Sequence, residues 1–535
     1  MEMEKKVWSK LRTALLCILV AAMPFSMAGC GGDSSDDSTT GTSANTIVYG
    51  SADYTRINPA LDEHGEINIL IFNGLTAHGE DNIIEPCLAK SWEYDSATNT
   101  YTFALEEGVK WHDGEAFTAD DVKFTYEAIM DPANESENAP NYEDVEEIKV
   151  IDDYTVSFRL SAPNAAFLDY MTMAILPEHL LADADMQTDD YFFAPVGTGP
   201  YKFESWDAGQ SIVLTANEDY FKGAPNIETV IFKIVEDDNA KALQLQSGEL
   251  NISQIAPKEA EMFEDTDGYT VYDMTTSDYR GILYNFNNEY WQENADLIPA
   301  ISYAIDKQAI LDSVVLGKGD VAYGPIQRNM YNNEDVEHYD YDPDKAVQIL
   351  EEAGCTKEDD GYWYRNGEKI GFTINATPGD EVRKDMAQIC AQQLQEIGLD
   401  VKADVPENGI DWGGQECCII GWGSPFDADD HTYKVFGTDK GANYSGYSNA
   451  DVDKYLTEAR EVDTSDDPSA YNEERAEAYD AFQVALAENP AYTFTCYIDA
   501  IYVADSSIKG IDEDALLGHH GVGIFYNISD WTIEE

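Results

Sequence analysis

Three aspartates and a histidine gather in one short stretch of the chain, residues 421–433, which reads GWGSPFDADDHTY. Asp427, Asp429, Asp430 and His431 follow closely behind Trp422, which stands between two glycines. Such side chains can ligate a metal ion, act as paired acids in catalysis, or line the wall of a ligand cleft. Catalysis by paired acids requires a defined separation of the carboxylates, which a spacing of two residues on a loop does not provide. The hydrolase interpretation is therefore disfavoured.

Few other residues suggest chemistry. The sequence contains no HExxH, GxSxG, GxxxxGKS or GxGxxG motif. His519 and His520 could ligate a metal, but adjacent side chains on a strand point apart, so we expect no metal there. Acids in residues 340–351 match several positions of a calcium loop, yet Lys345 stands where such a loop needs glycine. We interpret Asp342 instead as the cap of a helix, and we expect no cofactor.

Length and composition predict a large folded protein with more than one lobe. The chain has 535 residues, of which 43% are hydrophobic and 12% aromatic, and its formal net charge is −71. Removal of residues 1–29 would take away four cations and two acids, which leaves 28 cations, 101 acids and a net charge of −73. Such a chain does not favour nucleic acid or an anionic lipid surface.

The amino terminus predicts export. Lys5, Lys6, Lys10 and Arg12 precede a short apolar run, and small residues then lead to Cys30. The tetrad of residues 27–30 resembles the bacterial lipobox, whose cysteine is lipidated and becomes the new first residue. We expect a signal peptide at 1–29, a lipid on Cys30 and a flexible Gly/Ser/Asp/Thr tether at 30–45. Six further cysteines permit disulfides outside the cytoplasm, but their pairing cannot be deduced from the sequence.

Strands and helices interleave along the rest of the chain, which predicts mixed α/β lobes to position the acidic stretch. Residues 101–111 and 152–163 alternate between apolar and polar types, as half-buried strands do. Thr118 and Asp121 have the spacing of a capping box at the start of a helix. Residues 197–220 predict two strands about a turn at Ala208 and Gly209.

Seven blocks in order resemble the family 5 extracellular solute-binding proteins, the peptide, nickel and oligosaccharide receptors of ABC importers. The most characteristic is YTFALEEGVKWHDGEAFTADDVKFTYEAI, and others include PVGTGPYKFESWDAGQ, NFNNEYWQENADLIPAISYAIDKQAIL and NYSGYSNADVDKYL. The resemblance covers residues 46–535. It implies an α/β fold like that of class II periplasmic binding proteins, with two hinged lobes and an inserted third lobe. Lobe I would comprise residues 46–75, 196–275 and 505–535, lobe II residues 76–195, and lobe III residues 276–504.

The resemblance also implies where the ligand binds. In the peptide-binding branch, a Trp-x-x-Asp sequence on lobe III supplies a carboxylate for the amino terminus of the peptide. Here Trp422, Gly423 and Ser424 are followed by Pro425, so the usual anchor is missing, and we predict that Asp427 replaces it, with Asp429 as second choice. The other ligand-binding residues predicted from family position are Tyr279, Arg280, and, in the segment Glu66–Asn68, Ile67 and Asn68. For Arg280, pairing with a ligand carboxylate and an internal salt bridge are equal alternatives.

Three functions follow as hypotheses. The first is a lipid-anchored, extracytoplasmic receptor that delivers peptides to the permease and ATPase subunits of an importer. The second keeps this role for a metal chelate or an oligosaccharide, and the third is an exported hydrolase. Under the first two the protein is not an enzyme, and we expect a monomer that is attached to the membrane only through its lipid.

Overall fold

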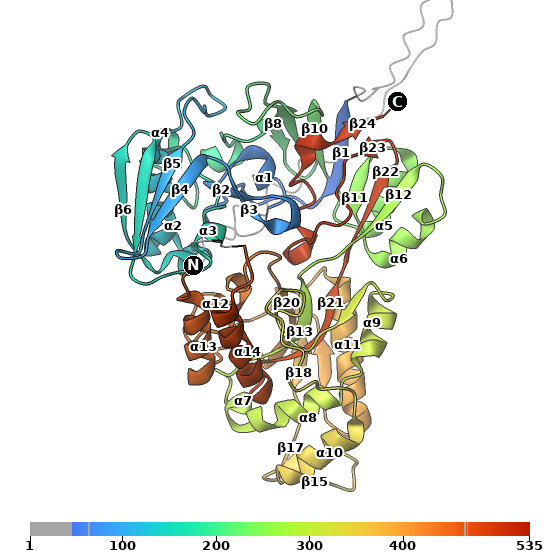
Figure 1. Ribbon diagram of the computed structural model, residues 1–535. Helices are drawn as coiled ribbons and strands as arrows, with labels where there is room; N and C mark the ends of the chain where they lie inside the picture. The colour runs from blue at the N-terminus through green and yellow to red at the C-terminus, as the bar shows by residue number, and fades with distance from the viewer. Residues whose placement is uncertain (1–44, 62–64, 465–466, 468, 535) are drawn as a thin grey trace, which may run out of the picture. The chain divides into compact units, whose positions relative to one another are not determined.

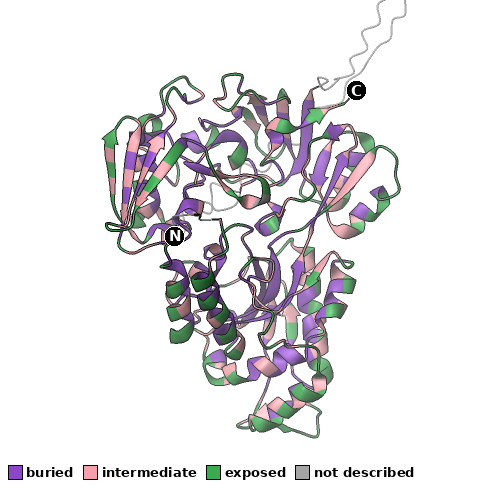
Figure 2. Cartoon of the chain, viewed as in Figure 1, coloured by how far each residue is buried: buried purple, intermediate pink, exposed green. Residues whose placement is uncertain are grey.

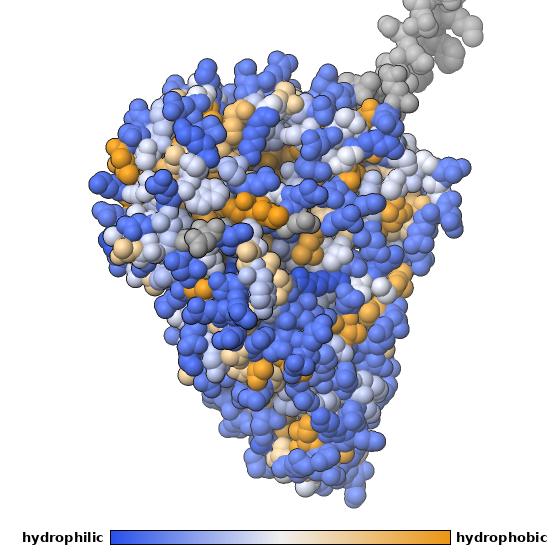
Figure 3. Space-filling model, viewed as in Figure 1, coloured by the Kyte–Doolittle hydropathy of each residue, from blue (hydrophilic) through white to orange (hydrophobic). Residues whose placement is uncertain are grey.

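The computed structural model describes residues 45–61, 65–464, 467 and 469–534, and it is mixed α/β, as predicted. The predicted export signal and Cys30 lie outside the described residues. Central strands of the two largest sheets are buried, whereas exposed positions lie on helices, on loops and on strands of a smaller sheet (Figure 2). Hydrophilic residues dominate the face shown in Figure 3, in keeping with the excess of acids. Within the described ranges, no helix has the length and apolar content that a membrane span requires.

A seven-stranded mixed sheet is built around β1, Thr46–Ser51, whose six residues are all buried. The predicted hairpin is confirmed: β8 and β9 pair antiparallel, and Gly209 in the turn has a φ of 74°, which glycine adopts without strain. The strand order is β12-β22-β11-β1-β10-β9-β8. The other bounds are β8 Tyr201–Asp207, β9 Ser211–Ala216, β10 Thr229–Ile234, α5 Asp238–Ser247, β11 Ile252–Gln254, α6 Pro257–Ala260, β12 Tyr269–Met274 and β22 Ala500–Asp505.

A four-stranded antiparallel sheet in the order β4-β5-β7-β6 packs against α2, Ala119–Met130 (Figure 1). The capping box between Thr118 and Asp121 is present at the start of that helix, as predicted. The bounds in and beside this region are α1 Asn68–Ile71, β2 Thr76–His78, β3 Ile84–Pro86, β4 Ala89–Asp95, β5 Thr100–Leu105, β6 Val145–Asp152, β7 Thr155–Leu160, α3 Phe167–Tyr170 and α4 Glu178–Leu181.

A six-stranded sheet in the order β14-β21-β13-β20-β18-β19 carries helices on both faces. Neighbouring residues of β20 belong to different cores because strand side chains alternate. Cys417 packs with α8 and α11, whereas Cys418 and Trp422 pack with α12, α13 and α14. The bounds are β13 Tyr279–Tyr284, α7 Glu289–Asn294, α8 Ile298–Tyr303, α9 Lys307–Val314, β14 Gly319–Val321, β18 Thr373–Asn375, α11 Glu381–Ile397, β19 Lys402–Asp404, β20 Cys417–Trp422, α12 Asp430–Phe436, α13 Ala450–Arg460, α14 Glu473–Glu488 and β21 Tyr492–Ile498.

Local signals in this region agree with the structure. Asp342 caps α10, Pro343–Glu352, by accepting a hydrogen bond from the Lys345 backbone N–H, so the acids of residues 340–351 form a helix start and not a calcium loop. Three short strands, β15 Thr356–Lys357, β16 Trp363–Arg365 and β17 Glu368–Lys369, follow that helix, and β23 Ile508–Lys509 pairs with β24 Thr532–Ile533 near the end of the chain. All six cysteines of the described residues are buried and free.

The division into three lobes remains a prediction, for which the sheets supply a frame. β22 at Ala500–Asp505 pairs with β11 and β12 in the seven-stranded sheet. β21, which ends at Ile498, pairs in the six-stranded sheet. A boundary near residue 499 therefore fits the pairing better than the one expected after residue 504.

Candidate functional site

The acidic stretch begins where β20 ends, beside the start of β13. Trp422 lies opposite Tyr279 in the ladder, and the two glycines around the tryptophan are required by close approach. A Cβ on Gly421 would lie 1.9 Å from Nη1 of Arg280, and one on Gly423 would lie 1.7 Å from the backbone oxygen of Ser277. The close packing of these two paired strands thus fixes the position of the residues that follow. We call residues 423–431 the aspartate loop.

Asp427 in the aspartate loop forms a buried ion pair within the protein. Both of its carboxylate oxygens accept hydrogen bonds from the Arg475 guanidinium, on α14, at 2.5 Å. Asp427 is 8% exposed and Arg475 1%. Because this two-pronged pairing uses the face that a ligand ammonium would need, Asp427 is poorly suited to be the predicted amine anchor.

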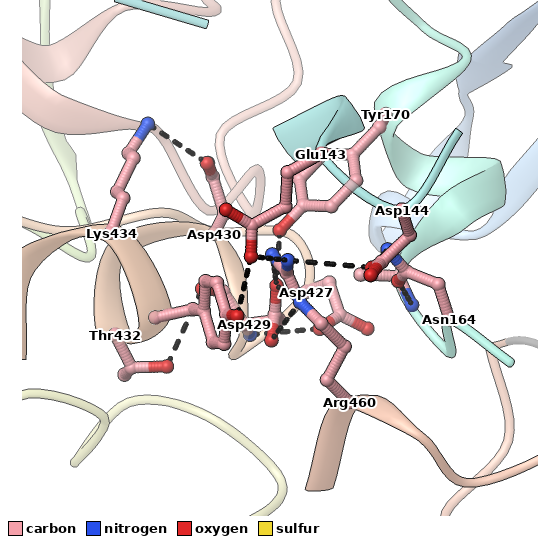
Figure 4. A network of polar contacts seen from close by, with 12 residues as sticks. Glu143, Asp144, Asn164, Tyr170, Asp427, Asp429, Asp430, Thr432, Lys434 and Arg460 are labelled. Carbon is pink, nitrogen blue, oxygen red and sulfur yellow. Dashed lines mark hydrogen bonds and ion pairs between the residues drawn. The ribbon is translucent and has the colours of Figure 1, made fainter. Parts of the chain in front are cut away.

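Asp429 is held in the same way, by a different arginine (Figure 4). Its carboxylate accepts from Nε and Nη2 of Arg460, on α13, at 2.6–3.2 Å, and from the Tyr170 hydroxyl at 2.5 Å. Nη1 of Arg460 lies 3.7 Å from Glu143 and 3.6 Å from Asp144. The network therefore joins the aspartate loop to residues 143–170, and Asp429 neither caps α12 through its side chain nor faces solvent.

Asp430 and His431 also have partners close by in the sequence. Asp430 pairs with Lys434 at 3.0 Å, one helical turn away. Nδ1 of His431 accepts a hydrogen bond from the backbone N–H of Gly423 at 3.0 Å. The aspartates and the histidine thus point to different partners, and they are not among the side chains of the described residues that gather as a possible metal site.

The side chains that do gather are Asp278, His519 and His520, whose ligand atoms lie within 4.8 Å of one another. Our expectation that the two histidines point apart on a strand is wrong, because His519–Gly521 is a 3-10 turn and the ring centroids lie 3.8 Å apart. His520 adopts a φ of 59°, which turns the backbone so that both residues contact Asp278. Nδ1 of His519 lies 2.9 Å from Oδ1 of Asp278, and the backbone N–H of His520 donates to Oδ2 at 3.0 Å.

Arg280 pairs with the same aspartate. The guanidinium donates from Nη1 to Oδ1 of Asp278, and both residues are buried. Burial opposes ionisation of Asp278, but Arg280 and His519 together hold its pKa well below the usual range. Nε of Arg280 has no hydrogen-bond partner among the described residues, so this arginine keeps one buried donor uncommitted.

Tyr279 lies with its ring in the core of the six-stranded sheet. It is fully buried and packs edge-on against Phe494 and Tyr497. Tyr279 is therefore less suited than Trp422 to contact a ligand. The Trp422 ring is stacked 5.9 Å from the ring of His519 and lies 5.8 Å from the ring of Tyr444. Trp412, which is 41% exposed, continues this series of rings because its ring lies 5.0 Å from that of Tyr444.

The predicted segment Glu66–Asn68 contacts the same region through the C-terminal loop, residues 517–526. The Glu66 carboxylate accepts hydrogen bonds from the backbone N–H groups of Gly523 at 2.9 Å and Ile524 at 3.1 Å. Burial raises the pKa of Glu66 to about 7, against the lowering effect of those two bonds. Ile67 is fully buried, and Oδ1 of Asn68 has no hydrogen-bond partner among the described residues. Glu66 thus fixes the loop that carries His519 and His520.

The structure brings the predicted residues together only in part. Trp422, Arg280 and the His519–His520 turn meet, whereas Asp427 and Tyr279 point into structural contacts. Ser424 is half-buried, and its hydroxyl accepts from the Phe426 backbone N–H at 3.3 Å. Sequence reasoning missed Trp412, Tyr444, Arg460 and Arg475. The arginines carry no local signal, because their partners lie 31 and 48 residues away.

Comparison with known proteins gives consistent similarities. The family model described as bacterial extracellular solute-binding proteins, family 5 Middle, matches residues 84–444. The oligopeptide-binding protein AppA of Bacillus subtilis is 29% identical over 98% of this chain and 99% of its own length. Protein XP55 of Streptomyces lividans is 31% identical over 94% of this chain and 92% of its own.

Solved structures agree. NikZ from Campylobacter jejuni, crystallised in complex with Ni(L-His), superposes with a TM-score of 0.85 at 33% identity over 91% of this chain and 99% of NikZ. AppA from Bacillus subtilis, crystallised with a nonapeptide, superposes with a TM-score of 0.80 at 28% identity over 92% of this chain and 99% of AppA. The similarity therefore concerns nearly the whole described fold.

Proposed function

The chain belongs to the bacterial extracellular solute-binding proteins of family 5, and from this premise we propose that it captures peptides and delivers them to the permease of an ABC importer. The observation that carries the proposal is a row of rings, Trp412, Tyr444, Trp422 and His519, which joins the end of β20 to the C-terminal loop. Rings of this kind give an extended solute a large contact area with few rotatable bonds. The likeness to the oligopeptide-binding protein AppA over nearly the whole chain supports the same ligand class.

The mode of peptide binding would differ from that first predicted. Asp427 and Asp429 are both engaged by arginines, so an amino-terminal ammonium would gain little from them while it lost its water. We propose that the aromatic row and buried donors such as Nε of Arg280 hold the peptide without an anchor at Asp427. Trp422, Arg280 and Asn68 are then the predicted site residues most suited to touch ligand.

A thermal-shift screen tests this proposal. Peptides of graded length should raise the melting midpoint of the mature chain, and acetylation of their amino termini should leave the shift unchanged. Trp422→Ala should lower peptide affinity, whereas Trp92→Ala, on β4 in the four-stranded sheet, should not. Absence of any peptide shift, or a shift that acetylation removes, would contradict the proposed mode.

A second candidate ligand is a metal chelate, favoured by the grouping of Asp278, His519 and His520 within 4.8 Å. Imidazole nitrogen and carboxylate oxygen are suitable ligands for a divalent transition metal. The structural similarity to NikZ is consistent with this candidate. Titration with Ni²⁺, alone and with L-histidine, separates it from the peptide proposal, because only the chelate hypothesis expects a midpoint shift without peptide.

The lipid on Cys30 and the monomeric state belong to the same proposal. Family membership places the protein outside the cytoplasm, and the lipobox-like residues 27–30 would attach it to the membrane beside its permease. Mass spectrometry of the protein from its native membrane should find a lipid on Cys30. Cys30→Ala should release the protein into the soluble fraction, and sedimentation of the released chain should give the mass of one copy.

A further inference from the structure

A cavity of about 300 Å³ lies beside the six-stranded sheet, between α9, the segment 323–339 and the last turns of α14. Its lining includes none of the aromatic row and none of Asp278, Arg280, His519 and His520. The volume is at the lower end of the range of small-molecule sites. The cavity is therefore a separate space from the peptide site proposed above.

A buried lysine lines this cavity. Lys307, the first residue of α9, is only 5% exposed. Its Nζ donates to the backbone oxygen of Ala322 at 3.0 Å and lies 4.5 Å from the centroid of the Tyr323 ring. Among the described residues no carboxylate lies within 4.0 Å of that nitrogen. An ammonium group has three donors, so most of its hydrogen-bonding capacity remains for something inside the cavity.

The walls suggest what that occupant would be. Leu486, Tyr492 and Phe494 form an apolar side, and Asn332 and His338 contribute polar atoms elsewhere in the lining. An unpaired buried cation is costly, and an anion placed against it would offset that cost. The apolar side would in turn accept a short hydrocarbon or aromatic body.

Nearby acids favour a monoanion over a dianion in this cavity. Glu334 in the lining and Asp340, whose Oδ1 accepts from the Tyr323 hydroxyl at 2.7 Å, are exposed acids near the cavity. They would repel a dianion such as a phosphate ester more strongly than a carboxylate. We propose that the cavity binds a small organic monocarboxylate, whose carboxylate pairs with Lys307 and whose apolar body packs on Tyr492 and Phe494.

The site should respond to pH. Burial lowers the pKa of Lys307 to about 7, with Asp340 acting in the opposite direction. The other titratable groups that line the cavity are Glu334, His338, Tyr323, Tyr339 and Tyr492. Since a carboxylate pairs with the protonated amine, its affinity should fall about tenfold between pH 6 and pH 8, as about nine-tenths of the lysine loses its proton.

Isothermal titration of the full mature chain with benzoate and with 4-methylpentanoate tests the proposal. Both acids should bind, about tenfold more weakly at pH 8 than at pH 6, and benzamide should not bind. Lys307→Met should abolish binding, whereas Lys345→Met, on α10 and 45% exposed beside Tyr303, should not change it. Equal binding of benzoate and benzamide, or unchanged binding by Lys307→Met, would overturn the proposal.

Two further measurements locate the site. A crystal grown with 4-bromobenzoate should show bromine in this cavity, and bromine only elsewhere would refute the assignment. If Lys307→Met does not fold, Phe494→Trp, which places a larger ring on the cavity wall, should weaken benzoate binding instead. Trp412→Ala, at the exposed end of the aromatic row, should weaken peptides and leave benzoate unaffected, so failure of the peptide proposal is distinguishable from failure of this one. If a peptide that binds at the aromatic row displaced benzoate, the two ligands would share one site and the inference would be wrong.

Discussion

The aspartate loop and the Asp278 group are both built from acids and histidines near β13 and β20, but they differ in how their carboxylates are paired and in how far their members are exposed. Asp427 and Asp429 each have an arginine that occupies the carboxylate from inside the protein. Around Asp278, by contrast, one aspartate serves Arg280 and both histidines, Nε of Arg280 has no hydrogen-bond partner within the described part of the chain, and His520 is exposed. The two-pronged arginine contacts mark Asp427 and Asp429 as structural, even though Nη1 of Arg460 reaches Glu143 and Asp144 only at 3.7 and 3.6 Å. The uncommitted donor of Arg280, beside an exposed histidine, marks the second region as the better place for a ligand.

Removal of an arginine that pairs with the aspartate loop should have the largest effect on stability. Arg475→Met leaves the Asp427 carboxylate buried and unpaired, which should lower the free energy of unfolding by about 3–5 kcal/mol. The shift of the urea midpoint, followed by tryptophan fluorescence, measures it. Adding Asp427→Asn should restore much of the loss, and Arg159→Met, in an exposed pair with Glu146 that solvent screens, should have a far smaller effect. A double variant no better than the single one would show that charge burial is not the cause.

Glu66, which fixes the C-terminal loop, should give the next largest effect, as a dependence on pH. Its pKa is about 7 in the folded protein against 4.5 as the ordinary value. Between these values the folded state keeps a proton that the unfolded state has lost, so stability should fall as pH rises from 4.5 to 7, by on the order of 3 kcal/mol. Above pH 7 this contribution is constant.

Glu66→Gln checks that sign. Glutamine imitates the protonated carboxyl and keeps one acceptor for the loop, so the variant should be more stable than the parent at pH 8 and similar to it at pH 4. Thermal midpoints across this pH range are the measurement. Parallel curves for parent and variant would assign the pH dependence to other groups.

Tyr170→Phe should have a moderate effect, because Asp429 loses one donor and keeps Arg460. A hydrogen bond to a charged group contributes about 2 kcal/mol. Tyr142→Phe is a matched control, since the Tyr142 hydroxyl donates to a neutral backbone oxygen at 2.7 Å, and it should cost about 1 kcal/mol. Equal losses in the two variants would count against the special role of the charged acceptor.

His520→Asn should change stability least, by about 0.5 kcal/mol or less, because the side chain is exposed and asparagine tolerates a positive φ. If the Asp278 group binds a metal chelate, the same variant should remove the midpoint shift produced by Ni²⁺ with L-histidine. His179→Asn, beside Asp113, should alter neither property. Retention of the nickel response in His520→Asn would show that the Asp278 group is not the nickel site.

Local patterns predicted much of the fold. The capping box at Thr118, the Asp342 cap and the hairpin around Gly209 each depend on residues a few positions apart, and all three are present. The site was predictable only where it follows family order, as at Trp422. The two histidines were misplaced because period-two alternation was assumed for a segment that forms a 3-10 turn.

The sequence by itself determined that the chain is a multi-lobed α/β protein of this receptor family, and that the usual acid after Trp422 is replaced by Pro425. Only the tertiary structure decided that Asp427 and Asp429 are occupied, because Arg475, Arg460 and Tyr170 reach them from 48, 31 and 259 residues away. A carboxylate looks the same in a sequence whether it is free or paired. Which it is depends on distant cations brought close by folding, in an interior where an unpaired charge is too costly to keep.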